Sequence, residues 1–328
     1  MKVLLIGGTG LISTAISRDL LARGDEVVLY NRGKTEARLP AGATTIVGDR
    51  KDFPAFEAEM ANHTFDAVID MIGYHPDEIQ SCLRAFRGRI GHYIFCSTVD
   101  VHTKPCATYP VTEHTPRDPI GDYGVNKKII EDILFNQSDL PFTIIRPAHT
   151  YGESSTMIHT FGWIPYMLKR LRHGLPVVVH GDGTSLWASC HVDDVARAFV
   201  NALGNPVALG KAYQTTGEQC VTWDQYHQHI ARAMGAPDPT IVHIPTDVLT
   251  KWEPDRTGVV KNNFQYCNIF DNSLARAELG FVQKIELEEG ARRTVAWLDE
   301  RNKIDSAADE PFYDQLLERW DRAINGTL

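Results

Sequence analysis

Residues 1–12, MKVLLIGGTGLI, predict the fold of the first half of the chain. The apolar run at residues 3–6 is typical of a buried parallel strand, and it ends in a glycine-rich turn. Apolar residues then recur at helical spacing, which predicts a helix directly after the turn. A strand, a glycine turn and a helix in this order hold a dinucleotide pyrophosphate on backbone N–H groups and the helix N-terminus. The stretch therefore favours a dinucleotide site over a plain connecting turn.

The glycines of this turn have separate tasks. Gly7 allows the tight bend, and Gly10 lets the backbone approach the phosphates without a Cβ atom in the way. The spacing Gly7-x-x-Gly10-x-x-Ser13 places a small serine where a third glycine often stands. We expect the residues of the turn to contact the dinucleotide: Gly7, Gly8, Thr9, Gly10, Leu11 and Ile12.

The composition argues against several classes of protein. The formal net charge of −9 disfavours a nucleic-acid-binding protein, which needs a basic face. Six scattered cysteines without a Cys-x-x-Cys pair predict reduced thiols in a cytoplasmic protein and no bound metal. No apolar run is long enough to span a membrane, and the first residues are typical of a strand rather than of a signal peptide.

Strand-like and helix-like stretches alternate through the first half of the chain. The strand-like stretches are residues 26–30, 44–47, 67–71, 92–96 and 143–146. Helical patterns lie between them, for example at residues 77–86 and 124–135. This alternation predicts an α/β fold built on a doubly wound parallel (Rossmann) sheet.

The pattern changes after residue 150, which predicts two domains. Residues 1–150 are expected to form the dinucleotide-binding domain, and residues 151–328 a smaller C-terminal substrate lobe. Residues 190–202 of that lobe are expected to return to the Rossmann domain. An apolar stripe in residues 311–324 predicts a C-terminal helix docked on the protein's own surface or on a dimer mate.

The pentapeptide Tyr123-Gly-Val-Asn-Lys127 is a second signal, because residues four positions apart share one face of a helix. A neighbouring ammonium and a cationic nicotinamide both favour the phenolate, so Tyr123 is a candidate acid–base residue. Such a pair alone is more often a surface feature. The glycine turn favours a catalytic interpretation, as does Ser97-Thr98 at the carboxyl end of the strand-like residues 92–96, where ligands of such sheets bind.

At this point the chain resembles the extended short-chain dehydrogenase/reductase superfamily, in its NAD-dependent epimerase/dehydratase branch. The resemblance rests on GGTGLIS, Gly48-Asp49, FCSTVDV, YGVNK, IIRPAHTYG and GDGTSLWASCHVDDVARAF. It implies that Tyr123 is the acid–base residue, that Lys127 anchors the cofactor ribose, and that Thr98, in preference to Ser97, orients the substrate hydroxyl. It also implies further cofactor contacts: Asp49 at the adenine, Pro147, Ala148 and His149 near the carboxamide, and Arg50, Met71, Ile72 and Gly73.

Departures from the family pattern bear on the substrate. Nucleotide-sugar members usually carry an arginine for the diphosphate where this chain has Trp187, which favours a free sugar or another uncharged ligand. Trp187 can equally be a packing residue. Val99 and Asp100 stand where sugar dehydratases carry two acids, so elimination loses support. The candidate substrate contacts are Asp100, His102, Tyr151, Trp163, Trp187 and His191.

The second strand bears on the cofactor. An acid at its end would bind the ribose 2′-hydroxyl and repel a 2′-phosphate. This chain has Asn31, Arg32 and Lys34 there, which favours NADP while leaving NAD open.

Two functions remain in competition. The first is an NAD(P)-dependent epimerase or dehydrogenase/reductase acting on a carbohydrate-like small molecule, and the resemblance implies a homodimer. The second is a non-catalytic NAD(P)- or RNA-binding protein like the chloroplast stem-loop-binding proteins, which share the Asn-Arg-Gly second strand and lack the phosphate arginine. The intact set of Thr98, Tyr123 and Lys127 and the acidic charge favour the enzyme.

Overall fold

The computed structural model describes residues 1–34 and 41–326. The chain divides into two compact units. The first unit comprises Met1–Thr150, Cys190–Glu218 and Phe270–Lys284, and the second comprises Tyr151–Ser189, Gln219–Ile269 and Ile285–Leu328. The first unit takes in two later segments, of which sequence analysis predicted only the one beginning near residue 190.

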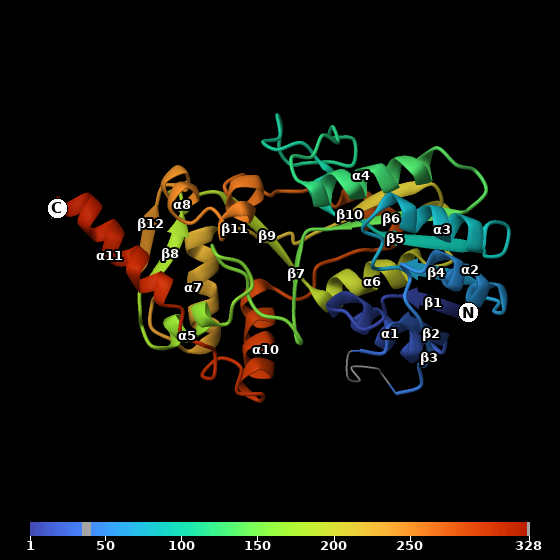
Figure 1. The fold of residues 1–328 in the computed structure, drawn as a ribbon, viewed down its shortest axis with the longest axis horizontal. Coiled ribbons are helices and arrows are strands. Elements are labelled where there is room, and N and C mark those ends of the chain that lie inside the picture. The colour runs from blue at the N-terminus through green and yellow to red at the C-terminus, as the bar shows by residue number, and fades with distance from the viewer. Residues whose placement is uncertain (35–40, 327–328) are drawn as a thin grey trace. The chain divides into compact units, whose positions relative to one another are not determined.

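A seven-stranded sheet organises the first unit, in the order β10-β6-β5-β4-β1-β2-β3 (Figure 1). Every neighbouring pair is parallel. The strands are β1 (Lys2–Ile6), β2 (Glu26–Asn31), β3 (Thr44–Val47), β4 (Ala67–Asp70), β5 (His92–Cys96), β6 (Phe142–Pro147) and β10 (Lys211–Thr215). The predicted Rossmann fold is therefore confirmed, with a topological switch point where β1 lies between β2 and β4.

Helices cover both faces of this sheet. One apolar core joins Val3 and Leu5 of β1 to α1 (Leu11–Arg23), α6 (Val192–Ala202) and α9 (Ser273–Leu279). The opposite core joins Leu4 and Ile6 to α2 (Phe53–Ala61), α3 (Pro76–Phe86) and α4 (Asp122–Phe135). Successive side chains of a strand point to opposite faces, so an unbroken apolar strand such as β1 requires cover on both.

The second unit is built around two apolar clusters, one that includes Tyr151 and Trp223 and one that includes Phe161 and Tyr313. Its elements are α5 (Tyr166–Arg172), β8 (Val177–His180), β11 (Cys220–Thr222), α7 (Trp223–Met234), β12 (Ile241–Ile244), α8 (Thr246–Trp252), α10 (Leu287–Asp299) and α11 (Pro311–Asn325). β8 and β12 pair in parallel, and β11 pairs antiparallel with β9 (Leu186–His191). Short β7 (His149–Tyr151) follows β6 in the chain.

The C-terminal helix α11 docks on the second unit of its own chain, one of the two positions that its apolar stripe allows. The Tyr313 hydroxyl accepts a hydrogen bond from the Val178 N–H group at 2.7 Å. The rings of Phe312 and Tyr313 meet Phe161 at centroid distances of 5.2 and 5.4 Å. None of the helices in the described ranges combines the length and apolarity that a membrane crossing requires.

Candidate active site

The turn between β1 and α1 has the geometry that its glycines predict. Gly7 adopts φ +86°, and its N–H group donates to the Tyr30 carbonyl at 2.9 Å. A Cβ atom on Gly7 would lie 2.5 Å from the Ile72 side chain. Ser13 replaces the third glycine usefully, because its hydroxyl accepts the Gly10 N–H at 2.8 Å and so caps α1.

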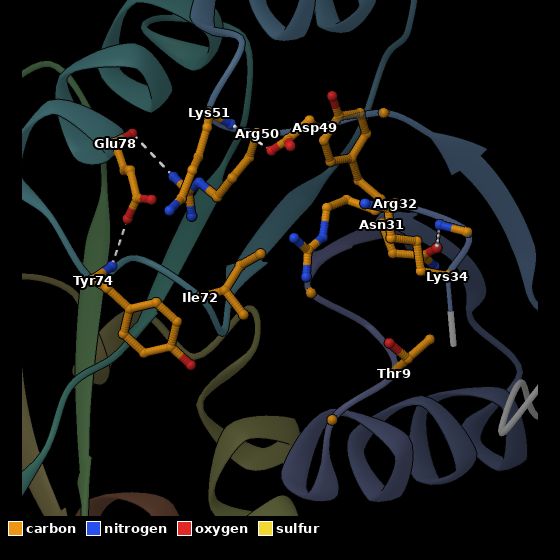
Figure 2. Close-up of a pocket in the computed structure, with 15 residues that line it drawn as sticks. Thr9, Asn31, Arg32, Lys34, Asp49, Arg50, Lys51, Ile72, Tyr74 and Glu78 are labelled. Atoms are coloured by element: carbon orange, nitrogen blue, oxygen red, sulfur yellow. Dashed lines mark hydrogen bonds between the residues drawn. The ribbon is translucent and has the colours of Figure 1, made fainter. Parts of the chain in front are cut away.

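A cavity of about 480 Å³ opens beside this turn, and we name it the basic cavity (Figure 2). It lies at the carboxyl ends of β1 and β2. Sequence analysis predicted nine of its residues, which are Gly7, Thr9, Gly10, Asn31, Arg32, Lys34, Asp49, Arg50 and Ile72. Tyr30, Gly33, Gly48, Lys51, Tyr74 and Glu78 complete the lining.

The cations of the basic cavity are not equivalent. Arg50 is buried, and its guanidinium donates to both Asp70 oxygens at 2.6 and 2.8 Å and to the Glu78 carbonyl at 3.0 Å. Burial opposes its charge, but Asp70 outweighs burial and raises the Arg50 pKa. The Arg50 guanidinium is therefore already bound within the protein and forms part of the cavity wall. Arg32, Lys34 and Lys51 form no ion pair with any residue that the structure describes.

Polar loops shape the same cavity. The Asn31 side-chain oxygen accepts the Gly33 N–H group at 2.8 Å, and Asp49 accepts the Lys51 N–H group at 3.0 Å. These local hydrogen bonds fix the turns that carry the cations, as Asn and Asp side chains commonly do.

A second cavity of about 280 Å³ contains the predicted catalytic residues, and we name it the Tyr123 cavity. It shares Gly7, Gly10, Ile72 and Tyr74 with the basic cavity. The other predicted residues that line it are Leu11, Ile12, Met71, Ser97, Thr98, Tyr123, Lys127, Pro147 and Ala148. Ser13, Cys96 and Thr150 line it as well.

Tyr123 is a neutral phenol in the free chain. Although 48% of the residue is exposed, enclosure of the phenol group raises its pKa above the usual range. Cys96 and Asp100 act in the same direction, and a hydrogen bond with the Thr98 side chain opposes them. Lys127 was expected to favour the phenolate, but desolvation is the largest influence and the Tyr123 pKa is raised. A bound nicotinamide cation would act in the opposite direction and lower this pKa.

Lys127 is buried at 1% exposure, and its ammonium donates to the Cys96 carbonyl at 2.6 Å. This hydrogen bond connects α4 to the end of β5. Burial lowers the Lys127 pKa, while Cys96 and Asp70 oppose that shift. Lys127 thus stands where parallel strands end, beside Thr98 and Tyr123 in the lining of one cavity.

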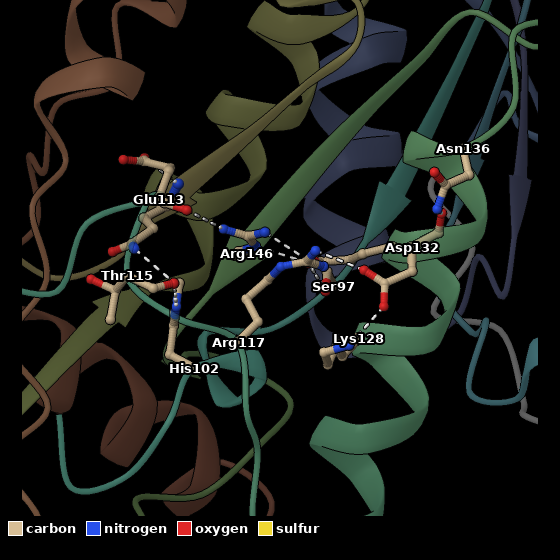
Figure 3. Close-up of polar contacts among 11 residues, drawn as sticks. Ser97, His102, Glu113, Thr115, Arg117, Lys128, Asp132, Asn136 and Arg146 are labelled. Atoms are coloured by element: carbon tan, nitrogen blue, oxygen red, sulfur yellow. Dashed lines mark hydrogen bonds and ion pairs between the residues drawn. The ribbon is translucent and has the colours of Figure 1, made fainter.

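Ser97 belongs to a buried charge network (Figure 3). Its hydroxyl donates to Glu131 at 2.6 Å. Arg146 reaches the same carboxylate with two hydrogen bonds of 2.8 and 2.7 Å, and Arg117 with one of 2.9 Å. The Ser97 hydroxyl therefore donates its proton to Glu131, whereas the Thr98 side chain hydrogen bonds with Tyr123. That Thr98 rather than Ser97 orients the substrate stays a prediction.

Two predicted substrate contacts, His102 and Trp187, line neither cavity. His102 is buried with Nδ1 at the Thr115 carbonyl (3.1 Å) and Nε2 at the Gln214 amide (3.2 Å), and burial lowers its pKa to about 4. Trp187 is 3% exposed and packs within the second unit. Its ring lies 4.8 Å from Trp223 and 5.0 Å from Phe264. Each is therefore corrected to a structural position.

Tyr151 is corrected in the same way, because it is fully buried in the core of the second unit and its hydroxyl donates to the Leu287 carbonyl at 3.4 Å. His191 is buried and caps α6 by accepting the Asp193 N–H group at 3.2 Å. Asp100 accepts a hydrogen bond from Lys104 at 2.7 Å, and Trp163 is an exposed residue of the second unit.

Three predicted cofactor residues line neither cavity. They are Gly8, packed under Leu29, Gly73, packed against Phe95, and His149, whose pKa is lowered to about 3 by burial. Within the described residues, no group of three or more His, Cys, Asp or Glu side chains is placed to hold a metal ion.

Sequence reasoning missed Tyr74 and Lys51. Each follows a predicted cofactor segment by one residue, Gly73 and Arg50 respectively. Their position shortly after a strand was the one feature that could have indicated a place at the site. No motif distinguished them from ordinary loop residues.

Comparison with known proteins agrees with this geometry. The sequence profile of the NAD dependent epimerase/dehydratase family matches residues 3–215. The chain belongs to this family. It is also 30% identical over 259 residues to the chloroplast stem-loop binding protein of 41 kDa b from Arabidopsis thaliana, covering 74% of this chain and 65% of that relative, just under two thirds of its length. It is 26% identical to 2′-dehydrokanamycin reductase from Streptomyces kanamyceticus, covering 78% and 72% of the two chains.

Solved structures share the fold. UDP-glucose 4-epimerase from Thermotoga maritima, solved with UDP-glucose, superposes with a TM-score of 0.72 at 20% identity, covering 92% of this chain and all of that one. The Bordetella bronchiseptica enzyme WbmH in complex with NAD+ gives 0.72 at 23% identity, covering 91% and 98%. The chain is thus an extended short-chain dehydrogenase/reductase of a nicotinamide-dependent family of epimerases, dehydratases and reductases. The Gly7 turn and the two adjoining cavities fit such a dinucleotide.

The turn can be tested with two glycines that share a positive φ. Gly7→Ala adds backbone strain and a contact with Ile72, whereas Gly24→Ala, at φ +90°, adds strain alone because nothing lies within 4 Å of its Cβ position. We expect both to lose about 1–2 kcal/mol of unfolding free energy from strain. Titration calorimetry should show at least about tenfold weaker nicotinamide dinucleotide binding only for Gly7→Ala. Equal affinities in the two variants would contradict this assignment of the turn.

Proposed function

We propose that the chain is an NADP(H)-preferring oxidoreductase or epimerase that acts on a hydroxyl or keto group of a carbohydrate-like molecule other than a nucleotide sugar. The observation that carries the proposal is the shared lining of the two cavities. Thr98, Tyr123 and Lys127 line a cavity that has its glycine turn in common with the basic cavity. A dinucleotide on that turn would place its redox end among acid–base and hydroxyl groups.

Each residue has a distinct task in this reaction. A bound nicotinamide supplies or accepts the hydride. Tyr123 donates a proton to the substrate oxygen when a keto group is reduced, and takes one back when a hydroxyl is oxidised. Thr98 orients that oxygen by hydrogen bonding. Lys127 binds the ribose and adds positive charge beside Tyr123, which counteracts the burial that raises the Tyr123 pKa.

The arginines of the second unit support a substrate without a diphosphate. Buried Trp187 stands where nucleotide-sugar relatives usually carry the phosphate arginine. The two arginines of the second unit that precede Trp187 in the chain already have carboxylate partners. Arg170 pairs with Asp314 at 2.7 Å, and Arg172 pairs with Asp299 at 2.7 Å and with Asp305 at 3.0 Å. Binding a diphosphate there would break one of these pairs.

An RNA-binding function is the second candidate, because one relative is named for stem-loop binding. The net charge of −9 disfavours it, since phosphate backbones require a basic surface. Gel-shift titration with stem-loop RNA separates the two. Submicromolar RNA binding at physiological salt, together with no cofactor binding, would establish the second candidate.

Cofactor choice can be measured with single alanine variants. Arg32→Ala and Lys51→Ala each remove from the basic cavity a cation that has no ion-pair partner among the residues that the structure describes. A charge-assisted hydrogen bond contributes about 1.5–3 kcal/mol, so we expect about tenfold or greater loss of NADPH affinity and little change for NADH. Arg87→Ala, an exposed cation paired with Asp139 outside the cavity, is the control. An equal loss for both cofactors would contradict 2′-phosphate recognition.

Turnover can be tested with a panel of free sugars, glycosides, keto-sugars and nucleotide sugars, followed by cofactor absorbance and NMR. We expect conversion within the non-nucleotide group. Tyr123→Phe should lose at least about a hundredfold in kcat, the lower range for a general acid–base group, with unchanged cofactor affinity. Tyr266→Phe, on the second unit, is the matched control. Conversion of UDP-sugars alone would overturn the substrate assignment, and an active Tyr123→Phe enzyme would overturn the mechanism.

We also propose a homodimer through α4. Its Ile130 and Leu134 are buried in the first unit, while Val125, Ile129 and Phe135 are 37%, 37% and 41% exposed. A helix that is apolar on its outer side as well favours a second copy. Light scattering should return twice the 36.7 kDa chain mass, and Ile129→Lys should return the monomer. Ile324→Lys, on α11, is the control. A wild-type monomer at micromolar concentration would refute the dimer.

A further inference from the structure

The Lys127 ammonium has an unusual environment. It is 1% exposed, and no described carboxylate forms an ion pair with it. Within the described ranges its one hydrogen bond is to the Cys96 carbonyl at 2.6 Å. A buried ammonium loses its hydration, which favours the neutral amine. Cys96, Asp70 and Glu78 oppose this effect through space without an ion pair, so a direct contact that favours the charged form adds to theirs.

Three aromatic rings surround this ammonium. Nζ lies 4.7 Å from the Phe95 ring centroid, 4.9 Å from Tyr74 and 5.7 Å from Tyr123. All three distances are within the range of a cation–π interaction, which gains strength when the cation is desolvated. The rings therefore replace part of the missing hydration.

Tyr74 differs from the other two rings. Phe95 is a core residue of β5, and Tyr123 is assigned to proton transfer. Tyr74 is 45% exposed and lies in the loop between β4 and α3. Its backbone N–H donates to the Glu78 carboxylate at 2.6 Å (Figure 2), which fixes the start of that loop. It also lines both cavities.

We propose that Tyr74 is a positioning residue, which holds the Lys127 ammonium charged and in place by a cation–π contact between the cofactor site and Tyr123. The effect of this contact on catalysis rests on the proposed function. The contact itself, between the Tyr74 ring and the Lys127 ammonium, does not depend on which substrate the chain binds. The ring of residue 74 matters here, and its hydroxyl does not.

Other charged or titratable groups also face Lys127 and influence its pKa. They are Asp70 at the end of β4, Cys96 of β5, Glu78 of α3, Tyr123 of α4 and Arg50 of the loop after β3. All of them remain in the chain when residue 74 is substituted. Tyr74→Phe removes the hydroxyl that raises the Tyr123 pKa, so this variant is the reference for the fluorinated rings. A change in the Lys127 titration therefore reports on the Tyr74 ring.

The experiment replaces Tyr74 with phenylalanine and then with phenylalanines that carry one, two and three ring fluorines. Fluorination withdraws charge from the ring face while nearly preserving shape. The readout is an NMR titration of the Lys127 ε-carbon in protein with isotope-labelled lysine, assigned with Lys127→Arg. We expect Tyr74→Phe to match wild type and the Lys127 pKa to fall stepwise with fluorination, by about one pH unit in all.

The sign of the functional effect follows. Lys127 is charged below its pKa, so a lowered pKa moves the alkaline loss of cofactor affinity to lower pH in the fluorinated variants. A Lys127 pKa that is constant across the series, or one that falls already in Tyr74→Phe, would overturn the proposal. If the Lys127 pKa falls stepwise but the wild-type chain shows no turnover, the proposed function is contradicted while the contact between Tyr74 and Lys127 is supported. Thermal melts, expected to be equal across the series, confirm that each variant is folded.

Discussion

The buried ammonium of Lys127 is the constraint on which the site depends. Its hydrogen bond to the Cys96 carbonyl fixes α4 against the end of β5. That contact sets Tyr123, one helical turn earlier, beside Thr98, two residues beyond the strand. A buried charge is costly, so the groups around the Lys127 ammonium must compensate for its lost hydration. The rings, the carbonyl and the neighbouring acids maintain it together, and the cofactor ribose would complete its coordination.

A buried charge network around Glu131 also connects α4 to the end of β5. Glu131 is one helical turn after Lys127 on α4, and it binds Ser97, Arg117 and Arg146. Breaking such a network by removing one partner leaves an uncompensated charge, which costs about 3–5 kcal/mol. The loop that carries Arg117 is thereby tied to α4. Helix α4 is thus held at two successive turns, by Lys127 and by Glu131.

The sequence predicted the sheet because β1 and its parallel neighbours are continuously apolar, a pattern that requires cover on both faces. It predicted that Thr98, Tyr123 and Lys127 lie together because Tyr123 and Lys127 have fixed helical spacing and Thr98 follows a strand end, and the three residues do line one cavity. The sequence wrongly predicted His102, Tyr151 and Trp187 as substrate contacts, because a position in a motif does not reveal which way a side chain points. In the structure all three side chains are buried among residues distant in the sequence. Tyr74 and Lys51 were missed for the converse reason, since loops bring them to the cavities without a motif.

The central claim is that the glycine turn, the basic cavity and the Tyr123 cavity form one dinucleotide site with an acid–base group at its end. The most direct measurement is a crystal structure of the chain with bound NADP+. The account predicts the pyrophosphate at the Gly7–Gly10 turn, the 2′-phosphate at Arg32 and Lys51, and the nicotinamide ribose within hydrogen-bond distance of Lys127. A dinucleotide bound elsewhere, or one whose nicotinamide lies away from Tyr123, would contradict it.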